Sequence, residues 1–164
     1  MEAVAVLTDI SRLKQQLAEL EELLRERELM FNLSEVGIAY LRGGRLERAN
    51  QALAAMTGYA SAELNGLEHA DLFEDRAAYL EHRSTEEQLL RQHGRVTTER
   101  RLRRRDGAVL WVQVSQRVVD EADPEGGTIC SYVDVDERHR ARQSLVLQAE
   151  RTRAVLDSVL RCSR

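Results

Sequence analysis

The chain has 164 residues, with 24 Lys and Arg against 28 Asp and Glu, so its formal net charge is −4. This length suits one domain of ordinary size with additional helix. The acidic balance argues against a dedicated nucleic-acid binder, because such proteins are usually basic overall. Charged residues at 32% and aromatic residues at only 4% favour long exposed helices beside a modest core.

Residues 1–30 form the first of three segments and have the pattern of a helix. Apolar residues alternate at spacings of four and three, which is typical of the seam of a two-stranded coiled coil. The seam consists of Val6, Ile10, Leu13, Leu17, Leu20 and Leu24. Arg27 takes the next core position, so the clean seam ends there. We expect a homodimer through this helix, with folding back onto its own domain as the alternative.

Residues 31–137 alternate short strand and helix patterns, and we expect them to form the globular α+β part. Asn50 is a plausible N-cap for the first helix after the two opening strands. The strand patterns cover 38–41, 45–49, 95–105, 109–120 and 127–135, and the helices cover 51–57, 61–64 and 75–92. The longest helix is expected to turn Ala78, Leu80, Leu89 and Leu90 toward the core.

Five arginines lie within residues 100–105, which read RRLRRR. Clustered arginines bind phosphate, so nucleic-acid binding through Arg100–Arg105 is one hypothesis. Asp106-Gly107 follow directly and favour a tight hairpin turn. The next residues alternate polar and apolar side chains as a strand does. We therefore interpret the arginines as solvated residues of one strand and its hairpin tip.

Residues 138–164 return to a helical pattern. Asp134 and Glu137 precede it at capping-box spacing. A second and weaker seam continues along it, made by Leu145, Ala149, Thr152, Leu156 and Val159. The chain stops inside this helix without a capping glycine. We interpret the chain as a piece of a longer protein with a further domain downstream.

Two cysteines, Cys130 and Cys162, form neither a CxxC pair nor any metal-ligand spacing. Isolated cysteines fit a reducing cytosol. The N-terminus lacks a secretory signal, and no apolar run is long enough to span a bilayer. We expect a cytoplasmic protein without a metal site, in which Cys130 is a small buried residue of an apolar strand.

Three motifs, in order along the chain, make Leu29 to Arg138 resemble the PAS domain of bacterial sensory proteins. RLERANQALAAMTGYASAELNG resembles the early segment of that family, and RRRDGAVLWVQVS resembles its late hairpin. DVDERHRARQ resembles the exit motif Asp-Ile-Thr-Glu-Arg, which leads into a signalling helix. The resemblance implies an α+β fold with a five-stranded antiparallel sheet and helices over one face. The space between them holds a ligand in some members and only side chains in others.

Strand alternation predicts that Val112, Val114, Gln116 and Val118 share the face opposite Trp111. The resemblance implies that this face lines the ligand space. From neighbouring strands it would be joined by Leu102, Ile129, Ser131 and Val133.

The resemblance also bears on cofactors. Flavin-binding photoreceptor members carry a reactive cysteine where this chain reads GLEHADLFED, and Val133 replaces their glutamine, so flavin is not expected. Haem-binding members use a histidine at the position of Arg83. His82 is one residue away, an offset that turns a side chain by about 100°. We therefore expect no cofactor, and we interpret His69, His82 and His93 as surface residues.

These observations favour a sensory and dimerisation module over an enzyme. No nucleophile and base pair or P-loop is present, and His139 lacks the context of a phosphorylated kinase histidine. The signal would pass through Asp134, Asp136, Glu137 and Arg138 into the second seam. It would reach an output domain such as a kinase, a diguanylate cyclase or another PAS domain. The alternative is a ligandless PAS scaffold that acts only in dimerisation.

Overall fold

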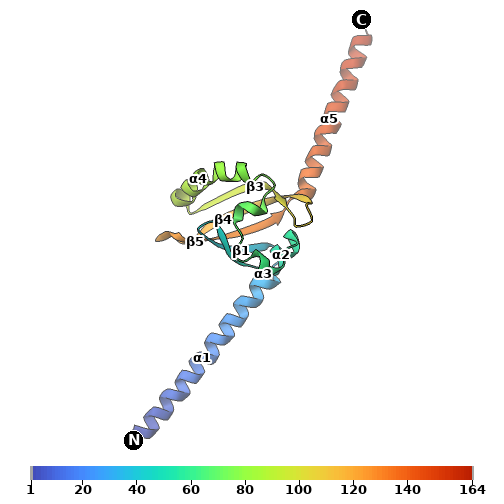
Figure 1. Cartoon of the computed structure of the whole chain (residues 1–164). Coiled ribbons are helices and arrows are strands. Elements are labelled where there is room, and N and C mark those ends of the chain that lie inside the picture. The colour runs from blue at the N-terminus through green and yellow to red at the C-terminus, as the bar shows by residue number, and fades with distance from the viewer. Residues whose placement is uncertain (1, 164) are drawn as a thin grey trace.

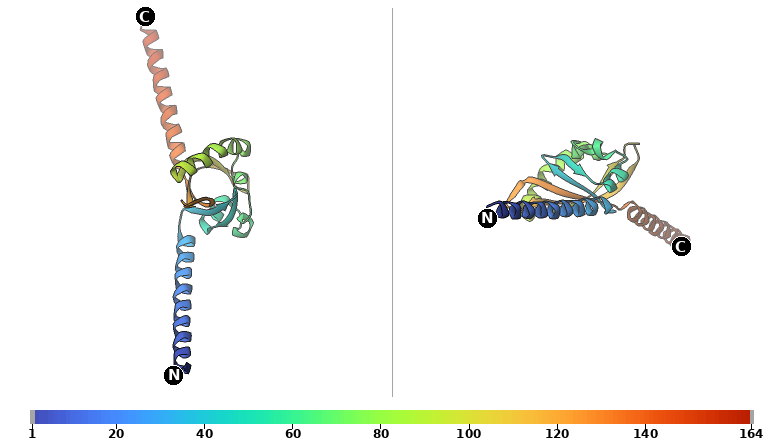
Figure 2. Two further views of the ribbon diagram at one scale, coloured as in Figure 1. Left: turned by 90° about the vertical axis from the view of Figure 1, so that its left-hand side faces the viewer. Right: turned by 90° about the horizontal axis from the view of Figure 1, so that it is seen from below.

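Two long helices leave a small α+β body in opposite directions (Figure 1). The computed structural model describes residues 2–163. Helix α1 (Glu2–Leu33) precedes the body and α5 (Asp136–Cys162) follows it. At a rise of 1.5 Å per residue they extend about 48 Å and about 40 Å. The left view of Figure 2 also shows both helices projecting away from the body. The fold-back alternative for residues 1–30 is therefore wrong.

The body is an antiparallel five-stranded sheet with strand order β2-β1-β5-β4-β3. This confirms the predicted fold class. The helices between β2 and β3 lie over one face of the sheet (Figure 2). The elements are β1 (Gly37–Arg42), β2 (Arg45–Ala49), α2 (Gln51–Thr57), α3 (Ser61–Leu64), the 3-10 helix η1 (His69–Leu72), α4 (Arg76–His93), β3 (Arg95–Arg103), β4 (Val109–Asp120) and β5 (Asp123–Asp134).

Asn50 ties the end of α1 to the sheet and to α2. Its Oδ1 accepts hydrogen bonds from the backbone N–H of Leu53 at 3.0 Å and of Ile38 at 2.9 Å. Its Nδ2 donates to the backbone carbonyls of Phe31 and Val36. The predicted N-cap is confirmed, and the same fully buried side chain also fixes where α1 stops.

The predicted inner face of β4 is correct, because Val112, Val114, Gln116 and Val118 are all buried. On β5 the prediction is wrong by one residue. Cys130 and Tyr132 are fully buried, whereas Ile129, Ser131 and Val133 lie on the outer face and Val133 is 41% exposed. Cross-strand pairing explains this, since partners share a face and Gln116 pairs with Cys130. Both alternating sets on β5 contain apolar residues, so periodicity did not distinguish them.

Helix α4 turns inward a face that overlaps the expected one only at Leu90 and the half-buried Ala78. Tyr79, Glu86 and Leu90 are buried, while Leu80 and Leu89 are exposed. The buried positions follow helical spacing, but one of them is a glutamate that an apolar count overlooks. An ion pair between Glu86 and Arg100 of β3 accounts for this rotation of the helix.

The capping box predicted before the last helix does not form. Helix α5 starts at Asp136, after Val135, which has no side chain able to cap it. Asp134 Oδ1 instead accepts the N–H of Asp136 at 2.9 Å. Glu137 is exposed. Among residues 2–163, no helix has both the length and the apolar character that crossing a bilayer requires.

Candidate functional site

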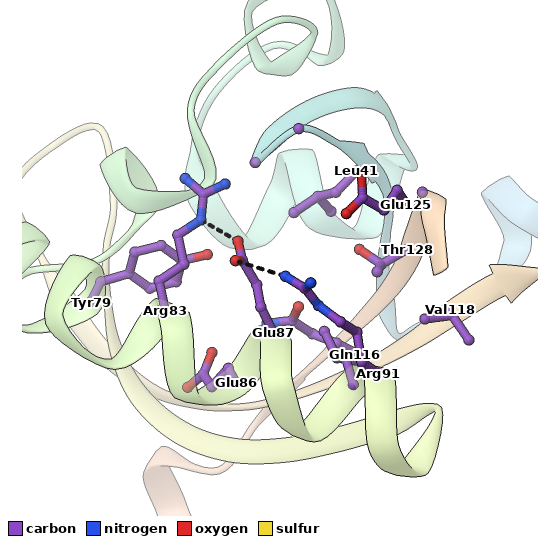
Figure 3. Close-up of a pocket in the computed structure, with 14 residues that line it drawn as sticks. Leu41, Tyr79, Arg83, Glu86, Glu87, Arg91, Gln116, Val118, Glu125 and Thr128 are labelled. Carbon is purple, nitrogen blue, oxygen red and sulfur yellow. Dashed lines mark hydrogen bonds and ion pairs between the residues drawn. The ribbon is translucent and has the colours of Figure 1, made fainter. Parts of the chain in front are cut away.

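A cavity of about 280 Å³ lies between α4 and the inner face of the sheet (Figure 3). The α4 wall is made by Tyr79, Arg83, Glu86, Glu87, Leu90 and Arg91. The sheet side includes Gln116, Val118 and Thr128, and the β1–β2 turn contributes Gly43 and Gly44. The cavity is therefore polar on its helix side and mixed on its sheet side.

Only Gln116 and Val118 of the eight predicted lining residues border this cavity. Leu102, Val112 and Val114 instead pack in the hydrophobic core. Ile129, Ser131 and Val133 face the other side of the sheet. On the helix wall only Leu90 was expected to face inward. Four of the other lining residues are charged, and the sequence pattern did not indicate that they and Tyr79 face the sheet.

Two arginines on the cavity wall share one carboxylate. Arg83 Nε donates to Glu87 Oε1 at 2.7 Å, and Arg91 Nη2 lies 4.0 Å from Glu87 Oε2 (Figure 3). The tip of Arg83 lies against Gly44, where an added Cβ would sit 3.0 Å from both terminal nitrogens. Gly44 has φ +78°, so two reasons favour glycine there.

Glu86 and Arg100 form an ion pair in which the side chains are only 10% and 15% exposed. The Arg100 guanidinium also lies over the ring of Tyr79, 5.0 Å from its centroid. Arg100 Nε has no hydrogen-bond partner among the described residues. The first arginine of the RRLRRR run is thus largely buried and ion-paired, and the prediction that it is solvated is wrong.

A buried histidine joins α4 to β5. His69 Nδ1 lies 2.8 Å from the Tyr79 hydroxyl, and Nε2 lies 2.7 Å from the Tyr132 hydroxyl. Burial, with the nearby Arg100 and Arg83, lowers the pKa of His69 to about 3, so the ring is neutral. Burial also raises the pKa of both tyrosines, which keeps them protonated. We call these three residues the Tyr–His–Tyr chain.

The expectation that His69 lies on the surface is wrong, because the residue is fully buried. It stands in η1 beside the buried Ala70 and Leu72, and its hydrogen-bond partners Tyr79 and Tyr132 lie on other elements. His82 is exposed, as expected, and its Nδ1 lies 2.7 Å from the Ala78 carbonyl oxygen.

A second cluster holds the root of α5 against the sheet. The Trp111 and His139 rings stack with centroids 4.3 Å apart, and His139 Nε2 lies 2.8 Å from Glu99 Oε2. Arg138 also pairs with Glu99, and Asp136 Oδ1 accepts from the Trp111 backbone N–H. The hydrogen bond with His139 and the nearby Arg138 lower the pKa of Glu99. We call Glu99, Trp111, Asp136, Arg138 and His139 the exit clamp.

Both predicted seams are open to solvent in the single chain. No residue of α1 or α5 is buried. The α1 seam exposes Val6, Ile10, Leu13, Leu17, Leu20 and Leu24, and the α5 seam exposes Leu145, Ala149, Thr152, Leu156 and Val159. A lone helix gains no stability from such apolar stripes, so they are suited to burial against another chain.

Carboxylates neutralise most of the arginine run. Besides Arg100 with Glu86, Arg101 Nε lies 3.0 Å from Glu74 and Arg105 Nη1 lies 2.6 Å from Glu63. These ion pairs weaken the hypothesis of a nucleic-acid site on this strand. Among residues 2–163, no three His, Cys, Asp or Glu side chains gather in a way that could hold a metal ion.

Comparison with known protein families finds that residues 35–137 match the PAS domain. The sensor protein TdiS of Thauera aromatica is 25% identical over 124 residues. The match covers 76% of this chain and 23% of TdiS, so the chain spans about a quarter of that relative's length.

Solved structures share the fold. An RNA-binding Light-Oxygen-Voltage receptor superposes with a TM-score of 0.66 and 28% identity, over 81% of this chain and 38% of that one. The PAS domain of an HTR-like protein from Haloarcula marismortui gives 0.62 and 23%, over 74% and 98%. The PAS domain of a LuxR-family transcriptional regulator from Burkholderia thailandensis, in complex with ethanol, gives 0.59 and 24%, over 64% and 93%.

Proposed function

The chain belongs to the PAS domain family, and from that premise we propose that it is a sensory and dimerisation module of a bacterial signalling protein. In this proposal a small molecule in the cavity, or a change in α1, alters the PAS core. Helix α5 carries the change to an output domain, such as a kinase, a diguanylate cyclase or another PAS domain. The chain itself catalyses no reaction. Its similarity to TdiS, a sensor protein, supports this role.

The observation that carries the proposal is the exit clamp. It joins α5 to β3 and β4 through one aromatic stack, the hydrogen bonds of His139 and Asp136, and the half-exposed ion pair of Arg138 with Glu99. Exposed ion pairs each contribute only about 0–1 kcal/mol. The root of α5 is therefore held weakly enough to adopt a second position at small energetic cost, which a relay between two states requires.

The exposed seams supply the second part of the role. In a two-chain coil, each seam residue of α1 would pack between residues of the partner helix. Burying a leucine side chain stabilises an association by roughly 1.5–3 kcal/mol before the losses of ordering are counted. Six such positions in α1 favour a homodimer, with α5 as a weaker extension of the contact.

The chain offers a selective probe of this arrangement. Cys162 is exposed near the end of α5, whereas Cys130 is buried. A spin label on Cys162 allows the distance between the two α5 ends of a dimer to be measured in the full chain. We expect a dimer with one narrow distance distribution, which Trp111→Ala broadens and Trp111→Phe preserves. A monomeric chain, or a distance distribution that Trp111→Ala leaves unchanged, would contradict the proposal.

A ligandless scaffold remains the second candidate, and one observation favours it. Much of the space beneath the helices is filled by core side chains such as Leu102, Val112 and Tyr132. Native mass spectrometry of the freshly purified chain distinguishes the two candidates. Extra mass that is lost on denaturation supports a ligand sensor, whereas apo mass together with an intact dimer supports the scaffold. One similar structure is an RNA-binding receptor, but carboxylate partners on Arg100, Arg101 and Arg105 disfavour RNA binding by this strand.

A further inference from the structure

We propose that the cavity between α4 and the sheet takes a small carboxylate, held by Arg83, Arg91 and the hydroxyl of Tyr79. This inference rests on the proposed sensory function and names the chemical class of the signal. The three groups line the same wall (Figure 3). Each presents hydrogen-bond donors, which a carboxylate with two acceptor oxygens satisfies.

The two arginines hold more donors than the protein uses. A guanidinium has five N–H donors in a planar fork that matches a carboxylate. Arg83 engages Glu87 through Nε alone, and its two terminal nitrogens donate no hydrogen bond to another residue in the described chain. Arg91 is 4.0 Å from the same carboxylate, beyond hydrogen-bond distance. One glutamate thus serves two guanidiniums, and a ligand carboxylate would supply the second anion.

The Tyr–His–Tyr chain makes the Tyr79 hydroxyl a donor toward the cavity. A neutral imidazole has one N–H donor and one acceptor nitrogen, so one tyrosine donates to His69 and the other accepts from it. The accepting tyrosine keeps its own proton free for a third group. Tyr132 is fully buried, and beyond His69 the nearby acceptor is the Cys130 thiol, which is weak. The free proton therefore belongs on Tyr79, which lines the cavity.

The position of the free proton defines the tautomer of His69. Its Nδ1–H donates to Tyr79, and its Nε2 accepts from Tyr132. In the opposite tautomer, with the proton on Nε2, Tyr79 would donate its hydroxyl proton to His69 Nδ1. The buried Tyr132 hydroxyl proton would then have no strong acceptor. His69 is thus a positioning residue that orients Tyr79 and does not itself touch the ligand.

Glutamates that border the cavity could compete with a ligand carboxylate for the two arginines. Glu86 is held by Arg100, and Glu125 is an exposed residue of β5. Glu87 contacts the arginines that the ligand would use, so it is an internal competitor. Removing the charge of Glu87 should strengthen carboxylate binding, whereas for a cationic ligand the sign would be reversed.

The first test is a titration of the full chain with a panel of C2 to C8 mono- and dicarboxylates and their matched amides and amines. Binding is followed by isotope-edited NMR at millimolar ligand. We expect carboxylates to bind. Arg83→Gln should lower their affinity roughly tenfold through loss of a charge-assisted contact, and Glu87→Gln should raise it. Arg103→Gln, on an exposed residue outside the cavity, is the matched control and should change nothing.

The outcomes separate this inference from the sensory function. If amides or amines bind in the cavity and carboxylates do not, the carboxylate assignment is overturned while ligand sensing stands. If nothing in the panel binds, the assignment is also overturned, and the relay is judged by the Cys162 distances. If Glu87→Gln instead lowered the affinity for carboxylates, Glu87 would not be a competitor of the ligand.

The second test reads the tautomer of His69 from its ring ¹⁵N shifts, without any ligand. We expect a proton on Nδ1 in the native chain and in Tyr132→Phe, and a proton on Nε2 in Tyr79→Phe. Tyr79→Phe should also weaken the bound carboxylate. A native chain protonated on Nε2 would show that Tyr79 presents no donor, and the role given to His69 would fail. Circular dichroism melts establish that each variant is folded.

Discussion

At the scale of single residues, His69 shows how burial changes the chemistry of a side chain. Both ring nitrogens meet tyrosine hydroxyls, and the ring packs edge-on against Phe73, Tyr79 and Tyr132. Protonation would place a charge in this apolar cluster near Arg100 and Arg83. Burial and the two nearby arginines therefore favour the neutral imidazole.

Acid should destabilise the fold through His69. The pKa of this residue is near 6.5 in the unfolded chain and about 3 in the folded one, so the unfolded chain binds the additional proton. The stabilisation is complete above about pH 6.5 and is lost as the pH falls from there toward 3, by up to about 1.4 kcal/mol per pH unit.

Urea unfolding measured at intervals between pH 7 and pH 4 tests this dependence. The native chain should lose stability more steeply than His69→Gln, whose amide can still meet both hydroxyls but does not titrate. Equal slopes for the two proteins would argue against a titrating His69.

The Glu86–Arg100 pair should contribute much more to stability than a surface pair from the same strand. Glu86→Gln leaves the buried Arg100 guanidinium without its counter-charge, and such losses cost about 3–5 kcal/mol. Glu74→Gln breaks the exposed Arg101 pair and should cost about 0–1 kcal/mol. Chemical denaturation of both variants gives the comparison, and similar costs would contradict the burial argument.

At the scale of elements, α1 is an amphipathic helix whose apolar seam is covered by nothing else among residues 2–163. Its apolar seam continues for six positions and is then interrupted by Arg27 before Phe31. Phe31 lies 5.8 Å from the ring of Tyr40 and has the Arg48 guanidinium over its face. The seam therefore runs along the helix toward the sheet, and Arg27 is its weak point in a two-chain coil.

Arg27→Leu should tighten the dimer. The substitution replaces a charge in the seam with an apolar side chain, which gains roughly 1.5–3 kcal/mol per buried leucine. Arg25→Leu adds the same apolar surface off the seam and is the control. Sedimentation equilibrium gives both dimer constants. An unchanged constant for Arg27→Leu, or an equal gain for Arg25→Leu, would refute the seam.

At the scale of the whole molecule, the PAS core lies between two helices that leave it in opposite directions (Figure 1). Each helix contacts the core only near its root. Asn50 holds the end of α1, and the exit clamp holds the start of α5. A rotation at either root would therefore be transmitted along a rigid helix without repacking the core.

This geometry predicts that the arrangement of the dimer depends more on the direction in which the α1 seam faces, relative to the core, than on the length of α1. Deleting residues 14–20 removes seven residues, nearly two turns, and keeps the seam within about 20° of its direction from the core. Deleting residues 14–15 turns the seam by about 200°. The distance between spin labels on Cys162 should be unchanged by the first deletion and altered by the second. Equal distances in both would mean that α1 does not set the arrangement of the cores.

Features that depend on local geometry could be predicted from the sequence alone. The period of 3.5 marked the α1 seam, Asn50 marked a helix start, and alternation placed the inner face of β4, because each depends only on neighbours along the chain. The order of motifs indicated the PAS fold. Such patterns can be interpreted without knowing which helices and strands pack against one another.

Which polar groups are buried together depends on how distant elements pack, so it became visible only in the folded structure. The face of β5 follows from its pairing with β4, because Cys130 and Ile129 are equally suited to burial by composition. The rotation of α4 follows from the ion pair of Glu86 with Arg100, and the burial of His69 follows from two tyrosines on distant elements. A polar residue is stable inside a protein only when its partners are present. Those partners come from other parts of the chain, so the cavity and its donors emerged only with the fold.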